Sequence, residues 1–235
     1  MHIFLLDIDG TLLLTGGAGQ KAFAQTLADE FGIGEIIHPV MFAGRSDRAI
    51  AMDLFRLHGV EESVENWQRF CGSYISRLES ALVANQGLVL PGASELVMGL
   101  AGRDDVALGL LTGNVLQGAK RKLVHYDLWH WFAFGGYGDE HTHRNDIAAT
   151  ALAAGREHVY SRGSAQPNGR QLRHGEVIVI GDTPHDVTCG RSIGARCVAV
   201  PTGHTTADEL RQTNPDVLVE TLEDIEPILA LLDGR

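Results

Sequence analysis

Short apolar runs alternate with amphipathic segments along most of this 235-residue chain. A parallel strand that is buried on both faces reads as a continuous apolar run, and alternation of such runs with helices is typical of βαβ units. The pattern therefore predicts an α/β fold built on a parallel sheet. The expected strands are residues 3–6, 106–111, 132–134, 177–180, 196–200 and 217–219.

Residues 16–85 break this alternation, because they show helical periodicity and no convincing strand. Apolar residues between 64 and 82 follow the i, i+3, i+4, i+7 spacing of one helical face, and a second helix is expected to start near Ser46. Glycine-rich residues 16–19 and the segment 86–92 flank the stretch. We therefore expect an all-helical domain at 16–85, inserted into a core formed by residues 1–15 and 86–235.

The first apolar run ends in two aspartates, Asp7 and Asp9. Residues i and i+2 of a strand face the same way, and two strand steps span about 6.6 Å. Two carboxylates at that distance repel by roughly 2.5 kcal/mol at an effective dielectric near 20. We expect a cation, a shared proton or solvent to offset this repulsion. Ordinary turn chemistry at Asp9-Gly10 is the alternative, but ligands bind at the carboxyl ends of such strands.

Two more strand ends carry suitable groups. Thr112-Gly113-Asn114 precedes a helix, where a hydroxyl and backbone N–H groups are suited to bind an anion, although Thr112 could simply cap the helix. Asp182 follows the run at 177–180. Next to it, Thr183 and Asp186 fit a capping box with Pro184 at the first helical position, which accounts for Asp186 but not for Asp182.

One basic residue completes the set: Arg144 lies near the start of the helix expected after the strand around Phe134. A lone arginine is usually a solvated surface residue. Strand-end carboxylates, a Thr-Gly anion cradle and a cation are, however, together the parts of a magnesium phosphoryl-transfer site. Mg²⁺ takes oxygen ligands from one or two carboxylates, from substrate phosphate and from water.

Four motifs in this order resemble those of the haloacid dehalogenase-like hydrolase superfamily: DIDGTL (7–12), LLTGN (110–114), Arg144 and GDTPHD (181–186). The insert after the first motif is similar to the helical cap of the phosphoglycolate phosphatase and β-phosphoglucomutase branches. The resemblance implies a Rossmann-like core with an inserted cap domain. Arginine stands at the third motif, where the family commonly has lysine; it keeps the charge and can grip phosphate bidentately.

The resemblance also implies roles for the acids. Asp7 is expected to attack phosphorus and form an aspartyl-phosphate, and Asp9 to act as general acid and then as general base. Asp7, the main-chain carbonyl of Asp9, and Asp182 are expected to hold Mg²⁺. Asp186 is expected to support these ligands from behind.

A second group of residues is expected to bind the substrate. Thr112, Gly113 and Asn114 would contact the phosphoryl oxygens, and Arg144 would neutralise their charge. Arg45 lies just before a cap helix, at the position of the loop that related caps lower over the substrate. The alternative for Arg45 is a plain loop residue beside the helix cap Ser46.

We therefore expect a magnesium-dependent phosphatase that hydrolyses a small phosphorylated metabolite of the phosphoglycolate or sugar phosphate type. A sugar-phosphate mutase on the same core is one alternative. A non-enzymatic phospho-acceptor module, similar to a response-regulator receiver, is another; the helical insert and the late GDTPHD motif count against it. The presence of Asp9 counts against a dehalogenase and against an inactive binding protein.

The composition of the chain limits the classes of partner and the compartment that we expect. The net charge of −11 argues against nucleic-acid binding. Three cysteines without a C-x-x-C pair suit a reducing cytoplasm, and the apolar runs are too short for a signal peptide or a membrane span. A cytoplasmic monomer or homodimer is expected. The pair His141 and His143 is too sparse to predict a metal site, and the arginine-rich residues 156–176 are expected to form a loop at the amino end of the sheet.

Overall fold

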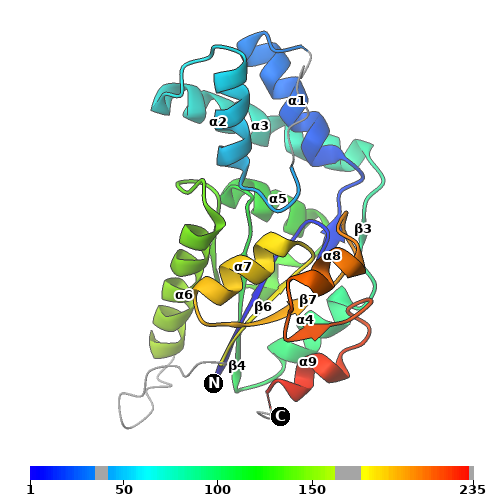
Figure 1. Ribbon diagram of the computed structural model, residues 1–235. Coiled ribbons are helices and arrows are strands. Elements are labelled where there is room, and N and C mark those ends of the chain that lie inside the picture. The colour runs from blue at the N-terminus through cyan, green and yellow to red at the C-terminus, as the bar shows by residue number, and fades with distance from the viewer. Residues whose placement is uncertain (35–41, 162–175, 233–235) are drawn as a thin grey trace.

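The computed structural model describes residues 1–34, 42–161 and 176–232 (Figure 1). Its main sheet is parallel and has the strand order β5-β4-β1-β6-β7-β8, which confirms the α/β class. Because the chain starts in the middle of the sheet and extends it first on one side and then on the other, the central strands β4, β1 and β6 lie beside one another. The strands are β1 (His2–Leu6), β4 (Val106–Leu111), β5 (Phe134–Gly136), β6 (Val177–Gly181), β7 (Arg196–Ala199) and β8 (Val217–Leu218).

Helices cover both faces of the sheet, which explains the continuous apolar runs. Side chains of β1 alternate: Phe4 and Leu6 pack with α4 (Ala93–Ala101), α5 (Leu116–His125) and α9 (Glu226–Ala230). Ile3 and Leu5 pack with α6 (Arg144–Ser161) and α7 (Pro184–Ser192) on the other face. The short helix α8 (Ala207–Gln212) packs beside α7 through Leu210.

Three helices lie together above the carboxyl ends of the strands (Figure 1). They are α1 (Ala18–Phe31), α2 (Asp47–Leu57) and α3 (Val64–Ala84), and they share a separate hydrophobic cluster that includes Phe23, Phe55, Phe70 and Tyr74. As the sequence indicates, α2 follows Ser46, whose Oγ accepts from the Ala49 N–H at 3.2 Å. A separate cluster supports the proposal that this cap (residues 16–85) is a domain of its own.

The two linkers of the cap pair with each other, which the sequence did not indicate. The two-residue strands β2 (Leu13–Leu14) and β3 (Leu88–Val89) form an antiparallel ribbon, and segments so short carry no periodicity. A Cβ atom on Gly87 would lie 2.3 Å from the carbonyl oxygen of Leu14, so the linkers approach backbone to backbone. The cap therefore joins the core through one narrow, closely packed hinge.

Three further details complete the fold. The strand expected at 132–134 begins at Phe134 instead, because Trp129–Trp131 form a 3-10 turn that the Phe132 N–H closes onto the Trp129 carbonyl. The prediction of a loop is wrong for residues 156–161, which belong to helix α6, and residues 162–175 lie outside the described part of the chain. Among the described residues, no helix is both long and apolar enough to span a membrane.

Candidate active site

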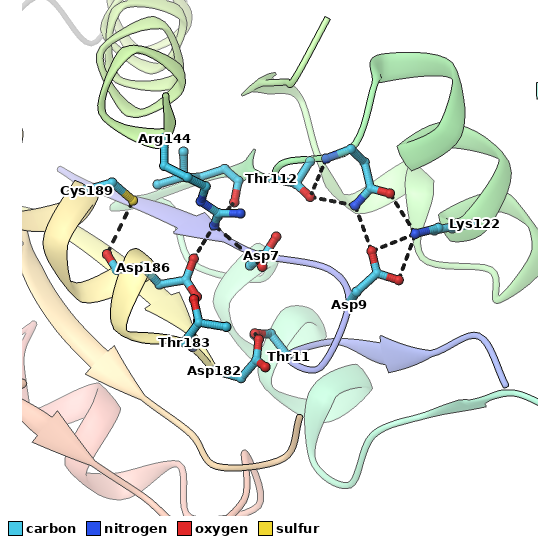
Figure 2. A network of polar contacts seen from close by, with 12 residues as sticks. Asp7, Asp9, Thr11, Thr112, Lys122, Arg144, Asp182, Thr183, Asp186 and Cys189 are labelled. Carbon is cyan, nitrogen blue, oxygen red and sulfur yellow. Dashed lines mark hydrogen bonds and ion pairs between the residues drawn. The ribbon is translucent and has the colours of Figure 1, made fainter. Parts of the chain in front are cut away.

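Polar residues from three neighbouring strands meet at the carboxyl edge of the sheet, beneath the cap (Figures 1 and 2). Asp7 directly follows β1, Thr112 follows β4 and Asp182 follows β6, and the parallel register sets these strand ends side by side. Arg144, the first residue of α6, points toward them. All four line a cavity of about 380 Å³ between core and cap, together with Asp9.

Three buried acids, two of which line this cavity, lie close together. Carboxylate oxygens of Asp7, Asp182 and Asp186 lie within 4.8 Å of one another. Burial raises the pKa of Asp7 to about 6, although Arg144 opposes the shift. Burial, then Asp186 and Asp7, raise the pKa of Asp182 to about 8. A divalent cation would offset the charge that burial disfavours, and an all-oxygen cluster fits Mg²⁺.

Two residues of the first motif, Thr11 and Gly10, lie against the side chain of Asp182. The hydroxyl of Thr11 donates to Oδ1 of Asp182 at 3.0 Å. Gly10 has φ +87°, and a Cβ there would lie 2.3 Å from Oδ2 of Asp182. Glycine is therefore required at this position, both by backbone conformation and by the close approach of the acid. Sequence reasoning gave neither residue a role at the site.

Asp186 makes contacts that explain its place behind the other acids. Its carboxylate accepts from the Thr183 N–H at 3.0 Å and from the Thr183 hydroxyl at 2.6 Å, as the capping pattern predicts. It also pairs with Arg144. These contacts leave Asp186 beside Asp7 and Asp182 rather than free to bind an ion itself. Its role in supporting the metal ligands stays a prediction.

Arg144 is buried, with 8% of its surface exposed, and so differs from a solvated surface arginine. Its Nη2 atom lies 3.5 Å from Oδ2 of Asp7 and 3.4 Å from the Leu111 carbonyl oxygen, and it pairs with Asp186. Burial alone would lower the pKa of Arg144, but the carboxylates of Asp186 and Asp7 raise it. A fixed positive charge thus stands next to the expected nucleophile.

A lysine that sequence reasoning missed, Lys122 on α5, holds the second aspartate. Its Nζ donates to Oδ2 and Oδ1 of Asp9 at 2.6 and 2.8 Å, and to Oδ1 of Asn114 at 2.6 Å. The Asn114 amide donates to Asp9 at 2.7 Å and to the Thr112 hydroxyl at 2.8 Å. Figure 2 shows the Asp9 carboxylate turned toward Lys122, so only its main-chain carbonyl suits the expected metal contact.

The signal for Lys122 was present in the sequence. Gly118, Ala119 and Leu123 are buried positions of α5, and a helical face that contains them also contains position 122. A lysine on a buried helical face needs a partner of opposite charge. Its partner, however, could not be read from helical spacing.

The cap contacts the second motif through Asp47, the first residue of α2. The Asp47 N–H donates to the Gly113 carbonyl at 2.7 Å, and Oδ2 of Asp47 accepts from the Val115 N–H at 2.9 Å. Arg45 lines the cavity, but its guanidinium pairs with Asp53 of α2 at 2.6 Å. The expected contact of Arg45 with substrate therefore stays a prediction that requires this ion pair to open.

His141, His143 and His185 take no part in the acidic cluster. His143 and His185 line a second cavity of about 620 Å³ beside α2, and Nε2 of His141 lies 3.2 Å from the Thr150 hydroxyl. Within the described residues, Asp7, Asp182 and Asp186 form the one group arranged to hold a metal ion.

Two sequence comparisons find similarity to known hydrolases. The family model described as HAD-hydrolase-like matches residues 145–225. The probable phosphatase IndB of Dickeya dadantii (strain 3937) is 28% identical over 147 residues, which are 63% of this chain. The match spans 58% of that relative's length.

Solved structures share the fold over nearly the whole chain. A hydrolase from Pseudomonas syringae has a TM-score of 0.69 at 21% identity and covers 100% of this chain and 99% of its own. CbbY from Rhodobacter sphaeroides, in complex with phosphate, has a TM-score of 0.70 at 16% identity, with 96% and 97% covered. A predicted phosphoglycolate phosphatase from Haemophilus somnus 129PT has a TM-score of 0.67 at 15% identity, with 97% and 98% covered. Residues 145–225 are thus similar to a family of haloacid dehalogenase-like hydrolases, and nearly the whole chain shares the fold of these three solved structures.

Proposed function

We propose that this chain is a magnesium-dependent phosphatase that hydrolyses a small phosphorylated metabolite through an aspartyl-phosphate. The observation that carries the proposal is the position of Asp7, at a strand end inside a cavity, 3.5 Å from a buried arginine and within a cluster of acids. A phosphatase name on the relative from Dickeya dadantii supports the same reaction class.

In the first step, a carboxylate oxygen of Asp7 attacks the phosphorus atom. The new Asp7–phosphorus bond forms as the bond from phosphorus to the leaving-group oxygen breaks. Asp9 gives a proton to that oxygen, so the product leaves as a neutral alcohol. Arg144, the Thr112 hydroxyl and the Gly113 N–H face the charge that develops on the phosphoryl oxygens.

In the second step, Asp9 takes a proton from a water molecule, which attacks the aspartyl-phosphate. The Asp7–phosphorus bond breaks, inorganic phosphate leaves and Asp7 is regenerated. The Asp9 carboxyl group thus serves as acid while protonated and then, as a carboxylate, as base.

Magnesium fits the acidic side of the cavity. Asp7, Asp182 and the main-chain carbonyl of Asp9 would hold the ion, and Asp186 would fix the arrangement through Arg144 and Thr183. When bound, the ion supplies positive charge that offsets both the carboxylates and the phosphoryl group.

The cavity sets the size of the substrate. Its volume of about 380 Å³ lies in the lower part of the range for small-molecule sites. Phe23, Phe42, Ile50 and Tyr74 line it on the cap side. A phosphoryl group at Asp7 leaves room for a small organic group beneath these side chains, so a metabolite of phosphoglycolate or sugar phosphate size is proposed.

Phosphate release from p-nitrophenyl phosphate and from a panel of phosphorylated metabolites tests the proposal. Each reaction is run with Mg²⁺ and with excess chelator, and the products are analysed for free phosphate and for isomers. Phosphate release that requires Mg²⁺ is expected. Isomerised sugar phosphate without phosphate release would identify a mutase, and full activity in chelator would contradict the metal-dependent mechanism.

A further inference from the structure

Lys122 has an environment built around one partner, Asp9 (Figure 2). Its side chain is 5% exposed. A buried ammonium group is stable only when it is paired and hydrogen-bonded. The Lys122 Nζ contacts both carboxylate oxygens of Asp9, at 2.6 and 2.8 Å, and Oδ1 of Asn114 at 2.6 Å.

Asn114 extends the hold on the same carboxylate. Because its Oδ1 accepts from Lys122, the amide must present its Nδ2 group to the remaining neighbours. That group donates to Oδ2 of Asp9 at 2.7 Å and to the Thr112 hydroxyl at 2.8 Å. Asp9 is thus fixed by two groups that the segment from β4 to α5 provides.

Asp9 needs such a hold, since its side chain is 41% exposed and lies beyond the end of β1. A carboxylate that transfers protons must stay within hydrogen-bond reach of the reacting oxygen. We infer that Lys122 is a positioning residue which, together with Asn114, holds the Asp9 carboxyl group at the cavity for proton transfer to the leaving group. The inference rests on the proposed phosphatase function.

The hydrogen-bond count argues against direct binding of a substrate anion by Lys122. An ammonium group has three donors. In Lys122 the three contacts to Asp9 and Asn114 use all of them. One of the two contacts to Asp9 is enough to hold the carboxylate while its other oxygen meets the leaving group. Lys122 therefore acts on substrate through Asp9.

The substitution Lys122→Met tests this role, because it removes the charge and keeps the length of the side chain. Two substrates of similar size are compared, benzyl phosphate and p-nitrophenyl phosphate. The benzyl alkoxide oxygen must receive a proton as it leaves, whereas p-nitrophenolate leaves without one. We expect kcat/KM to fall on the order of tenfold or more for benzyl phosphate and by less than about threefold for p-nitrophenyl phosphate.

The ratio of the two kcat/KM values does not depend on the fraction of active enzyme, so a partly folded preparation still gives a valid result. Lys122→Gln is the second variant and is expected to shift the ratio in the same direction. Lys120→Met is the matched control: Lys120 is exposed on the same helix, with Nζ 5.9 Å from the centre of the Trp129 ring. It should leave both rates unchanged.

Equal losses for both substrates would overturn the inference, as would a rise in KM alone, which would indicate substrate binding. Unchanged rates in Lys122→Met and Lys122→Gln would also overturn it. The proposed phosphatase function fails separately, if the unaltered protein releases no phosphate from any ester with Mg²⁺ present.

Discussion

Arg144 and Asp7 lie 3.5 Å apart, between Nη2 of the arginine and Oδ2 of the acid, inside a buried cluster. The contact links the start of α6 to the end of β1. Asp186 shares the same guanidinium, so one cation serves two acids. The proposed role of Arg144 is to support the expected nucleophile and to neutralise the charge of a bound phosphoryl group.

Arg144→Ala should lower phosphatase activity well over tenfold, because it removes charge stabilisation from the transition state. Phosphate release from p-nitrophenyl phosphate with saturating Mg²⁺ measures the effect. Arg156→Ala is the matched control on the exposed side of the same helix and should retain full activity. An unchanged rate in Arg144→Ala would show that another cation serves the third motif.

Asp7→Asn should abolish turnover, because an amide is a poor nucleophile for phosphorus. Acid quenching of the unaltered protein during turnover, followed by mass spectrometry, should find phosphate on the peptide that contains Asp7. The same treatment of Asp7→Asn should find none. A fully active Asp7→Asn variant would refute the aspartyl-phosphate mechanism.

The free energy of unfolding of the metal-free protein should fall as the pH rises from about 4 to 8. Asp7 and Asp182 have an ordinary pKa of 3.8 and folded values of about 6 and about 8. In this window the folded state binds more protons than the unfolded state, and stability decreases with pH in that case. The loss is fully developed only above the folded values.

Urea denaturation at several pH values, in chelator and in Mg²⁺, measures this dependence. Mg²⁺ should flatten the decline, because the ion replaces the protons on the acids. Asp182→Asn should also flatten it in chelator, whereas Asp208→Asn, at an exposed site, should not. Equal pH profiles with and without Mg²⁺ would argue against metal binding at these acids.

Gly113→Ala should displace the cap from the second motif. A Cβ atom on residue 113 would lie 2.1 Å from the carbonyl oxygen of Arg45, so the side chain would clash with the backbone of the cap loop. We expect a loss of about 1–3 kcal/mol in unfolding free energy, as is typical of overpacking, and reduced activity. Chemical denaturation and phosphate release measure the two effects.

Gly72→Ala is the control for this substitution. Gly72 lies within α3, and a Cβ there meets no atom within 4 Å. Alanine should stabilise that helix by up to about 1 kcal/mol and leave activity intact. Full stability and activity in Gly113→Ala would show that the cap loop does not need its contact with Gly113.

The sequence by itself determined the α/β core, its sheet strands to within two residues, and the placing of acids at the ends of β1 and β6. These features follow from local periodicity: buried strands need continuous apolar runs, and the residue after each run falls at the sheet edge. The helical cap was readable for the same reason. The ribbon of β2 and β3 was not, since its pairing depends on backbone contact between distant segments.

Only the tertiary structure decided which charged groups meet. Lys122 reaches Asp9 because α5 packs with that face toward the cavity, and Arg144 reaches Asp186 because α6 begins beside α7. Pairing of buried charges depends on distances of a few ångströms across the fold, since the interaction falls off with separation and with exposure to water. Spacing along the chain does not contain those distances.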